Sequence, residues 1–349
     1  MSKNTKNSRS SGGDKGPPLF LFWCREDSGS GRGGRLARDL GAVPFHAWRP
    51  GWDRGGTPAP VRYLFQALDT ARALRRLRPS AVYVQVPPVF ALVQAWWYGV
   101  RTGAPVAADN HSSFLDGKWR LFHWLQRPLA RRIRLNLAHN EANLEMLRRW
   151  RGDTALLLKS PAVTRDELLA EPGDLGPLRA ALDAPGAPRV FMVNRFAVDD
   201  AWREVFAAAR LMPGARFFVT GDPAKAGLSP GDAPGNVVLT GFLSKPVFAA
   251  LMDGCDVTLS LTLRRDTLLW SIRESVALGK PFVTSDSPVI RAEFEGLGLF
   301  TDHSAESLRD RILEAVENRD LWAEAMAGYI TRDRARWAGQ ITEIRKRMG

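Results

Sequence analysis

Short apolar runs alternate with amphipathic stretches along most of the chain. Five runs lie in the first half, at residues 18–23, 81–86, 105–109, 135–139 and 155–158. Five more lie in the second half, at residues 189–193, 216–220, 236–240, 256–260 and 281–285. Helical patterns separate most of them, and alternation of strand and helix predicts an α/β fold with parallel sheets covered by helices on both faces.

A looser segment near residues 162–187 separates the two series of runs. The 349 residues exceed one ordinary core and suit two domains of roughly 150 residues each. We therefore predict two Rossmann-like domains whose parallel sheets face each other across a cleft. Ligands of open parallel sheets bind at the carboxyl ends of the strands, so the ligand is expected in that cleft. The polar residues 1–18, rich in Gly and Ser, are predicted to be a disordered tail.

Charge and cysteine content narrow the class of protein. The net charge of +12 favours anionic partners such as nucleotide phosphates, nucleic acid or an acidic membrane surface. Cys24 and Cys255 give neither a disulfide framework nor a metal-binding spacing, which favours a reducing cytosol. The most apolar stretch, residues 82–100, is interrupted by Pro87-Pro88 and is predicted to be strand, turn and helix instead of a membrane span.

Three segments that follow predicted strands carry candidate ligand-binding residues. The stretch SGSGRGGRLARDLG, residues 28–41, could bring backbone N–H groups to an anion, and a loop without function is the alternative. His111 follows the strand at 105–109, although a lone histidine is more often structural. Arg195 follows the strand at 189–193 and could bind a diphosphate through two hydrogen bonds, whereas the alternative is a surface arginine.

The segment RRDTLLWSIRESVALGKPFVTSD, residues 264–286, carries two acids, Asp266 and Glu274. Ser271 and Glu274 fit a capping box, in which the serine caps a helix and the glutamate bonds back to its N–H. That interpretation does not account for Asp266. Alternatively, a carboxylate near a rigid helix start can accept both hydroxyls of a ribose, and the N–H groups of the helix start can bind a phosphate.

The order and spacing of these motifs resemble those of family 4 glycosyltransferases, which adopt the GT-B fold. Asp266-x7-Glu274 followed by SVALGKPFVTSD resembles the Glu-x7-Glu region of that family. VNRF, FFVTGD and VVLTGFLSKPVFAALMDGCDVTLSL precede it in the family's order, so the resemblance covers residues 188–320. In the first half, VYVQVPP and DNHSSF are similar to a region of the β-1,4-mannosyltransferases that build lipid-linked oligosaccharides.

The resemblance implies a role for each candidate residue. Glu274 would hold the nucleotide ribose, and Asp266 with its neighbour Thr267 would hold the donor sugar. Arg195 would contact the diphosphate. His111 would act on the sugar from the opposite domain, so the implied catalytic set is His111, Asp266 and Glu274.

The resemblance also implies the division of the chain. A first, acceptor-binding domain would comprise residues 19–165 joined by the last helix, 335–349, because the tail of a GT-B chain crosses back onto its first domain. A nucleotide-sugar-binding domain would comprise residues 166–334. In the first domain, Gly33 or Gly34 would approach the phosphates or the acceptor.

Two positions depart from the family pattern. The family's first acid is usually Glu, and here it is the shorter Asp266. The lysine expected a few residues after Arg195 is absent, since AVDDAW stands there. The missing positive charge would have to come from Arg203 or from Arg264 and Arg265, or the donor would be bound differently.

The sequence thus predicts a hexosyltransferase of bacterial type, active in glycan or polysaccharide biosynthesis. The donor would be a UDP- or GDP-sugar, with no metal or other cofactor, and the acceptor a lipid-linked or polysaccharide glycan. Arg195 and helix N-termini would stabilise the leaving diphosphate. The family 4 resemblance implies retention at the anomeric carbon. The mannosyltransferase resemblance implies inversion with His111 or Asp109 as base, and both routes stay open.

Two other classes of protein would carry different sequence patterns. A non-catalytic basic protein that binds membrane or nucleic acid should interleave basic and aromatic residues on its strands, and this pattern is missing from the sequence, so no nucleic-acid partner is expected. A nucleotide-sugar epimerase or dehydrogenase should carry Gly-x-Gly-x-x-Gly after its first strand and a Tyr-x-x-x-Lys pair, and the chain fits neither.

Residues 118–134 suggest attachment to a membrane, because they contain six basic residues and no acid. On a helix, one face would carry Arg120, Arg127, Arg131 and Arg134. The opposite face, assigned to the core, would carry Phe122, Leu125, Leu129 and Ile133. Trp124 falls at the edge of the basic face, and Pro128 should kink or split the helix. The hypothesis is that this face docks on anionic lipid at the cytoplasmic side of the membrane, and a solvated basic helix is the alternative.

Overall fold

The computed structural model describes residues 15–25, 32–52, 57–111, 117–151, 154–185, 188–265 and 267–349. The chain forms two compact units. Unit 1 contains Met1–Pro161 and Ala335–Gly349, and unit 2 contains Ala162–Arg334.

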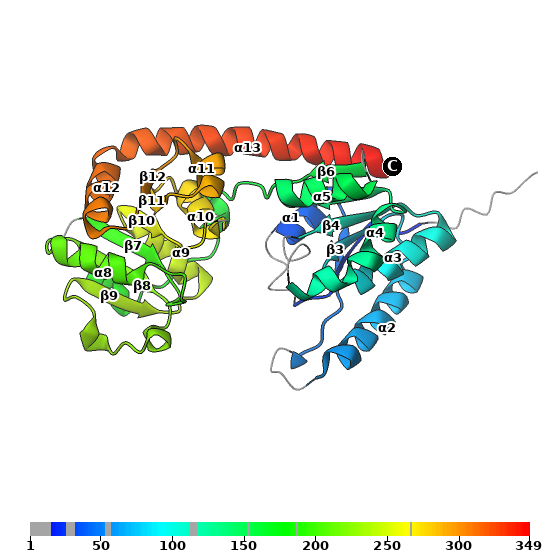
Figure 1. Ribbon diagram of the computed structural model, residues 1–349, viewed down its shortest axis with the longest axis horizontal. Helices are drawn as coiled ribbons and strands as arrows, with labels where there is room; N and C mark the ends of the chain where they lie inside the picture. Colours follow the sequence, from blue (N-terminus) through cyan, green and yellow to red (C-terminus); the bar gives the residue numbers. More distant parts are fainter. Residues whose placement is uncertain are drawn as a thin grey trace, which may run out of the picture. The chain divides into compact units, whose positions relative to one another are not determined.

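Unit 1 is built on a parallel six-stranded sheet with the strand order β2-β1-β3-β4-β5-β6 (Figure 1). The strands are β1 (Leu19–Phe22), β2 (Val43–His46), β3 (Val82–Val86), β4 (Val106–Asn110), β5 (Leu135–Ala138) and β6 (Ala155–Leu157). The helices are α1 (Arg32–Leu40), α2 (Ala59–Leu77), α3 (Val89–Thr102), the 3-10 helix η4 (Gly117–Phe122), α4 (His123–Ala130), α5 (Glu141–Arg151) and the end of α13 (Arg319–Met348).

Unit 2 repeats this architecture with the strand order β12-β11-β10-β7-β8-β9, again all parallel. The strands are β7 (Arg189–Val193), β8 (Arg216–Thr220), β9 (Val237–Gly241), β10 (Val257–Ser260), β11 (Phe282–Ser285) and β12 (Leu299–Thr301). The helices are α6 (Arg165–Leu168), α7 (Pro177–Asp183), α8 (Trp202–Leu211), the 3-10 helices η6 (Pro223–Ala226) and η7 (Pro230–Asp232), α9 (Lys245–Gly254), α10 (Trp270–Leu278), α11 (Pro288–Phe294), α12 (Ala305–Glu317) and the beginning of α13.

Both faces of each sheet are buried, which explains why the strands appear in the sequence as continuous apolar runs. In β1, Leu19 and Leu21 pack into one hydrophobic cluster, and Phe20 and Phe22 pack into another on the opposite face. The second cluster also contains Trp337, Ile341, Ile344 and Met348 from the last turns of α13. The end of the chain therefore completes the core of unit 1.

The predicted fold class, two Rossmann-like units with parallel sheets, is confirmed, but the sequence did not reveal two strands. β2 and β12 lie at edges of their sheets. β2 contains Pro44 and has its first two residues exposed, and β12 has three residues, so neither shows a long apolar run. No helix within the described ranges is both long enough and apolar enough to cross a membrane.

Candidate functional site

The sheet of unit 2 has a topological switch at β7. The chain leaves β7 for β8 and β9 on one side, and β10 pairs with β7 on the other side. Ligands of open parallel sheets bind beside the carboxyl ends of the two strands at such a switch. The segments that follow these ends are Asn194–Arg195 after β7 and Leu261–Arg265 after β10, so two predicted binding segments of unit 2 meet at one edge.

The backbone at Asn194 and Arg195 is fixed from two sides. The N–H of Asn194 donates to Oγ1 of Thr220 at 2.9 Å. The carboxylate of Asp200 accepts from the N–H groups of Arg195 and Ala197, each at 2.9 Å. The Arg195 side chain is exposed, so its guanidinium extends into solvent from a backbone that is held in place.

Gly221 lets this segment pack against the end of β8. Its φ is +97°, and a Cβ there would lie 2.6 Å from the carbonyl oxygen of Asn194 and 2.7 Å from the Cα of Arg195. Any other residue would therefore both strain the backbone and push the Asn194–Arg195 segment away.

Two buried polar side chains at the switch have no partner within the described residues. The Asn194 side chain is 3% exposed, and neither its Nδ2 nor its Oδ1 is hydrogen-bonded. Oγ of Ser260, which ends β10 opposite Val193 in the register, is buried and also unpaired. Leaving such groups unpaired costs about 1–3 kcal/mol each, so their presence at a switch point indicates groups that a polar ligand would satisfy.

The helix that carries Glu274 does not begin as the capping-box interpretation requires. α10 begins at Trp270 after Leu269, which makes no side-chain cap, and Ser271 is already inside the helix. The carbonyl of Ser271 instead accepts a hydrogen bond from the hydroxyl of Ser275 at 2.9 Å. The capping box is therefore wrong, and capping does not explain Glu274.

Glu274 is half-buried, and its electrostatic environment is unfavourable for a charge. Burial raises its pKa to about 7, and the positive charge of Lys245 at the start of α9 opposes this rise. Sequence reasoning missed Lys245, whose only local signal is the Ser-Lys-Pro start of α9. A half-buried carboxyl that is costly to ionise is typical of functional sites.

The other predicted residues of unit 2 lie on the loop between β10 and α10. Asp266 lies outside the described residues, and Thr267 beside it is half-buried. Nε of Arg264 forms an ion pair with the Asp199 carboxylate at 2.9 Å, which ties this loop to the segment after β7. Arg203 stacks over the Trp202 ring at 4.2 Å. Of the arginines proposed to replace the missing lysine, Arg264 thus contacts the segment after β7, where Asp199 partly offsets its charge.

In unit 1, His111 belongs to a charged cluster at the carboxyl end of β4. Its Nε2 lies 3.1 Å from Oδ2 of Asp109, whose other oxygen is bonded to the buried Arg32 guanidinium. Burial raises the pKa of Asp109, but the charges of Arg32 and His111 more than offset this and lower it to about 2. Asp109 is 1% exposed and stays ionised, whereas the His111 side chain is 26% exposed. The accessible group is therefore the histidine.

The predicted glycines of unit 1 lie in a helix and not in a loop. Gly33 and Gly34 occupy the first turn of α1, directly after the buried Arg32. A Cβ on Gly33 would lie 2.8 Å from the Phe22 ring, so this glycine allows α1 to pack closely on β1. Packing accounts for Gly33, and the residues before it, 26–31, lie outside the described residues.

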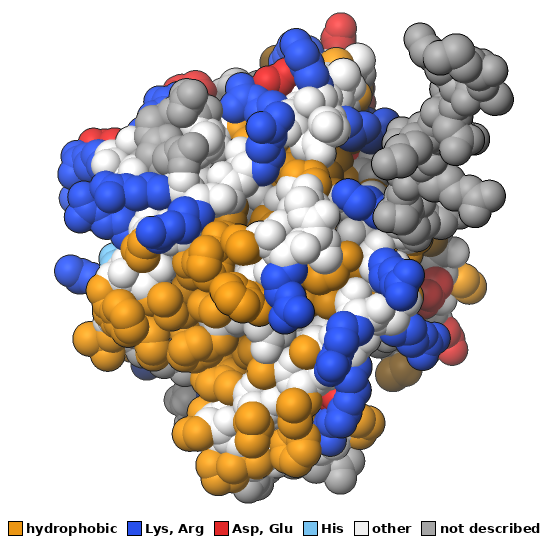
Figure 2. Space-filling view, turned by 90° about the vertical axis from the view of Figure 1, so that its right-hand side faces the viewer, with side chains coloured by type: hydrophobic (Ala, Val, Ile, Leu, Met, Phe, Trp, Pro, Cys, Tyr) orange, Lys and Arg blue, Asp and Glu red, His pale blue; other side chains and the backbone are white. Residues whose placement is uncertain are grey.

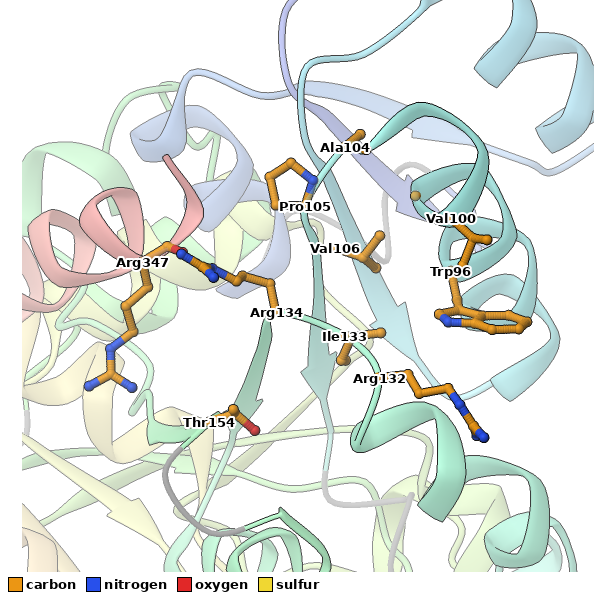
Figure 3. A pocket seen from close by; sticks show the side chains of 12 residues that line it. Trp96, Val100, Ala104, Pro105, Val106, Arg132, Ile133, Arg134, Thr154 and Arg347 are labelled. Carbon is orange, nitrogen blue, oxygen red and sulfur yellow. The ribbon is translucent and has the colours of Figure 1, made fainter.

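Two surface pockets of unit 1 lie away from these clusters. One, of 610 Å³, is formed at the amino ends of β4, β5 and β6, where Val106, Arg134 and Thr154 line it (Figure 3). Nε of Arg134 there donates to the backbone carbonyl of Arg347 at 2.8 Å. The other lies between α2 and α3. Neither is at the carboxyl edge where His111 lies. Within the described ranges, no group of three or more His, Cys, Asp and Glu residues is placed to hold a metal ion.

Comparison with known proteins gives structural matches alone. No protein-family model matches the chain, and no curated protein sequence matches it. A glycosyltransferase from Rickettsia africae is similar in structure, with 14% identity, a TM-score of 0.69, and coverage of 96% of this chain and 99% of that one. Anabaena HepE in complex with UDP-glucose matches with 16% identity, a TM-score of 0.64, and coverage of 95% and 98%.

A third match is sucrose-phosphate synthase from Thermosynechococcus elongatus, with 11% identity, a TM-score of 0.67, and coverage of 95% of this chain and 99% of that one. Identities this low show the fold alone. The chain has the GT-B fold, as the sequence predicted.

Proposed function

We propose that the protein is a glycosyltransferase that takes a hexosyl group from a nucleotide-sugar bound on unit 2. The observation that carries this proposal is the set of unsatisfied polar groups at the switch point of unit 2. Within the described residues, the Asn194 amide and the Ser260 hydroxyl are buried without partners, and Glu274 is a half-buried carboxyl that burial makes costly to ionise. The fold shared with glycosyltransferases supports the same conclusion.

Each group has a chemical role in this proposal. The Glu274 carboxylate accepts hydrogen bonds from the two ribose hydroxyls. The Arg195 guanidinium and the Asn194 amide bind the diphosphate from a backbone that is held in place, and they stabilise the negative charge that develops as the sugar leaves. The N–H groups at the start of α10 add donors for the phosphates. Asp266 and Thr267 are proposed to contact the donor sugar.

His111 is the proposed base if the reaction inverts the anomeric carbon. Because Asp109 stays ionised, the proton on Nε2 of His111 is directed at its carboxylate, and Nδ1 is left to accept a proton. The acceptor hydroxyl gives its proton to Nδ1 as its oxygen bonds to the anomeric carbon and the bond to the diphosphate breaks. Asp109, held by Arg32 at a pKa of about 2, is unsuited to be the base and positions His111 instead.

If the reaction retains the anomeric configuration, His111 would contact the sugar hydroxyls without taking the proton. The two routes differ in the anomer of the product, which NMR of the linkage distinguishes. The proposed acceptor is a lipid-linked or polysaccharide glycan. We also propose that the protein acts at the cytoplasmic face of a membrane.

A thermal-shift and calorimetric screen with UDP, GDP and their sugars tests the donor. We expect one nucleotide and its sugars to bind and to raise the melting temperature, and Arg195→Ala to weaken that binding. The nearby but stacked Arg203 provides a control, since Arg203→Ala should leave binding close to that of the wild type. Failure of every nucleotide and nucleotide-sugar to bind would overturn the proposal.

A further inference from the structure

Helix α2 carries an apolar stripe on its outer side. It packs inward through Gln66, Thr70, Ala73 and Leu74. Its exposed stripe consists of Val61, Leu64, Phe65 and Leu68, with exposures of 42%, 59%, 37% and 43%. The spacing i, i+3, i+4, i+7 is that of a helix face that normally packs against something. Among the described residues, Arg49 stacks over the Phe65 ring at 4.5 Å, while Val61, Leu64 and Leu68 remain exposed.

The neighbouring helix extends the apolar surface. α3 packs beside α2 and exposes Trp97 by 54% and Val100 by 59%. We call the surface formed by Val61, Leu64, Phe65, Leu68, Trp97 and Val100 the α2–α3 face. Figure 2 shows hydrophobic side chains gathered on this side of the molecule, with Lys and Arg side chains along their border. Leu121 and Trp124, 74% and 73% exposed, add apolar surface on η4 and α4, where α4 packs beside α3.

The charges near this face are mostly positive. The acid on α2, Asp69, forms ion pairs with Arg49 and Arg72. A groove of 970 Å³ between α2 and α3 is lined by Lys15, Arg75, Arg78 and Arg101. Residues 69–140 contain eleven Lys and Arg residues and three acids. Asp69 is paired with two arginines, Asp109 is buried against Arg32, and the third acid lies outside the described residues. An occupant of this surface must therefore be apolar and negatively charged at once.

A second copy of the chain does not meet that requirement, because it would bring an equal number of positive charges to the same contact. The headgroup region of an anionic bilayer meets it. There, Leu and Trp side chains enter the boundary with the acyl chains while Arg side chains reach the lipid phosphates. We propose that the α2–α3 face docks on an anionic lipid bilayer, with the apolar stripe inserted and the groove arginines bound to lipid phosphates.

The proposed α2–α3 face differs from the docking surface that the sequence suggested, residues 118–134. Residues 118–134 do not form one helix. They are divided between η4, which ends at Phe122, and α4, which ends at Ala130, and the remaining residues lead into β5. Nε of Arg131 donates to the carbonyl of Trp150 at 2.9 Å, and Nε of Arg134 donates to the carbonyl of Arg347. These two arginines are thus held by the protein, while Trp124 stays exposed beside the new face.

The docking deepens the proposed function, since a lipid-linked acceptor lies in a bilayer, but it is measured without any transfer reaction. The assay is flotation of the full chain with vesicles of phosphatidylcholine alone or with about 30% phosphatidylglycerol, at low and at physiological salt. At physiological salt, charges are screened over a Debye length of roughly 8 Å. We expect binding to the anionic vesicles that weakens as salt rises.

Two pairs of substitutions test the two parts of the face. Leu64→Ser/Leu68→Ser should lower the partition coefficient about tenfold, because two side chains no longer insert. Arg75→Glu/Arg101→Glu should lower it more, since each positive charge near such a surface is worth about fivefold. Matched controls are Leu313→Ser/Leu321→Ser, on exposed leucines of unit 2, and Arg148→Glu/Arg210→Glu, on exposed arginines of other helices. The controls should bind like the wild type.

Nucleotide-sugar binding by each variant separates this proposal from the previous one. Vesicle binding that fails while nucleotide-sugars still bind would overturn the docking and leave the proposed function intact. Equal binding to neutral and anionic vesicles, or equal losses in the controls, would also overturn it. If light scattering shows a dimer that Leu64→Ser/Leu68→Ser dissociates, and vesicles are not bound, a second copy is the occupant and the proposal is wrong.

Discussion

Replacing Glu274 by glutamine tests whether the protein keeps an acid at a position where a neutral side chain would be more stable. The substitution preserves the size of the side chain and its ability to hydrogen-bond. It removes the charge, which burial makes costly, and it removes the attraction to Lys245. Stability and ligand binding should therefore respond in opposite directions.

The size of the stability effect follows from the pKa of Glu274, which rises from 4.5 to about 7 in the folded protein. At about 1.4 kcal/mol for each tenfold change in the ionisation equilibrium, this corresponds to at most about 3.5 kcal/mol. The folded state holds the proton more tightly than the unfolded state. The stability contributed by the protonated carboxyl is therefore full below pH 4.5 and is lost as pH rises through about 7.

Urea unfolding at pH 5 and pH 8 measures this loss. At pH 8 we expect Glu274→Gln to be more stable than the wild type by about 1–3 kcal/mol, and at pH 5 the two should be nearly equal. Glu324 on α13 is an exposed control, so Glu324→Gln should change stability by less than about 0.5 kcal/mol at either pH. A Glu274→Gln variant that is less stable than the wild type at pH 8 would refute the argument from burial.

Ligand binding should show the opposite preference. The affinity of the wild type for its nucleotide-sugar should rise between pH 6 and pH 8, because the ribose hydroxyls bond to the ionised carboxylate. Glu274→Gln should bind about tenfold or more weakly at pH 8, since a hydrogen bond to a charged group is worth about 1.5–3 kcal/mol, and its affinity should not depend on pH in this range. Calorimetry measures both. Wild-type affinity and transfer in Glu274→Gln would remove Glu274 from the site.

Three further substitutions test other parts of the two clusters. Asp109→Asn should lower the free energy of unfolding at pH 7 by about 3–5 kcal/mol in urea titrations, because it leaves the Arg32 charge buried and unpaired. The stability that the Asp109 charge contributes is present above about pH 4 and is lost as pH falls through its pKa of about 2. A wild type whose stability does not fall in acid would contradict this. His111→Ala should lower turnover while the dissociation constant of the bare nucleotide stays nearly unchanged, and equal losses in both would place His111 elsewhere. Gly221→Ala should weaken nucleotide binding in calorimetry, because its Cβ would displace the backbone at Asn194, and unchanged affinity would show that this segment does not bind the ligand.

Much of the fold could be predicted because parallel strands buried on both faces are continuous apolar runs. All ten predicted runs coincide with strands. Of the four side chains assigned to the core, Leu129 and Ile133 are buried, and Phe122 and Leu125 are half-buried against the same cluster. The edge strands β2 and β12 could not be found in this way, since one side of an edge strand needs no apolar partner. The end of α4 was also missed, because it is set by the start of β5 and not by a local signal.

Some charged residues of the candidate site could be predicted from the sequence, whereas Lys245 and the neutral residues could not. Arg195 and Glu274 are recognisable from their position after strands and from a family resemblance. Nothing in the sequence distinguishes Asn194 or Ser260 from other residues at strand ends, because being buried without a partner is a property of the packed structure. The partner of Asp109 was missed for the same reason, since Arg32 lies far from it along the chain.

The contribution of α13 to the core of unit 1 has a consequence for how the protein is made on the ribosome. Trp337, Ile341, Ile344 and Met348 pack with Phe20 and Phe22, and Trp337 donates to the Asp39 carboxylate at 2.6 Å. The amino-terminal unit is thus synthesised first, yet its core stays open until the last residues of the chain have emerged. Unit 2 is continuous in sequence and needs no later segment. The half of the protein that is translated second can therefore finish folding before the half that is translated first, whose Phe20 and Phe22 lack part of their packing until α13 is complete.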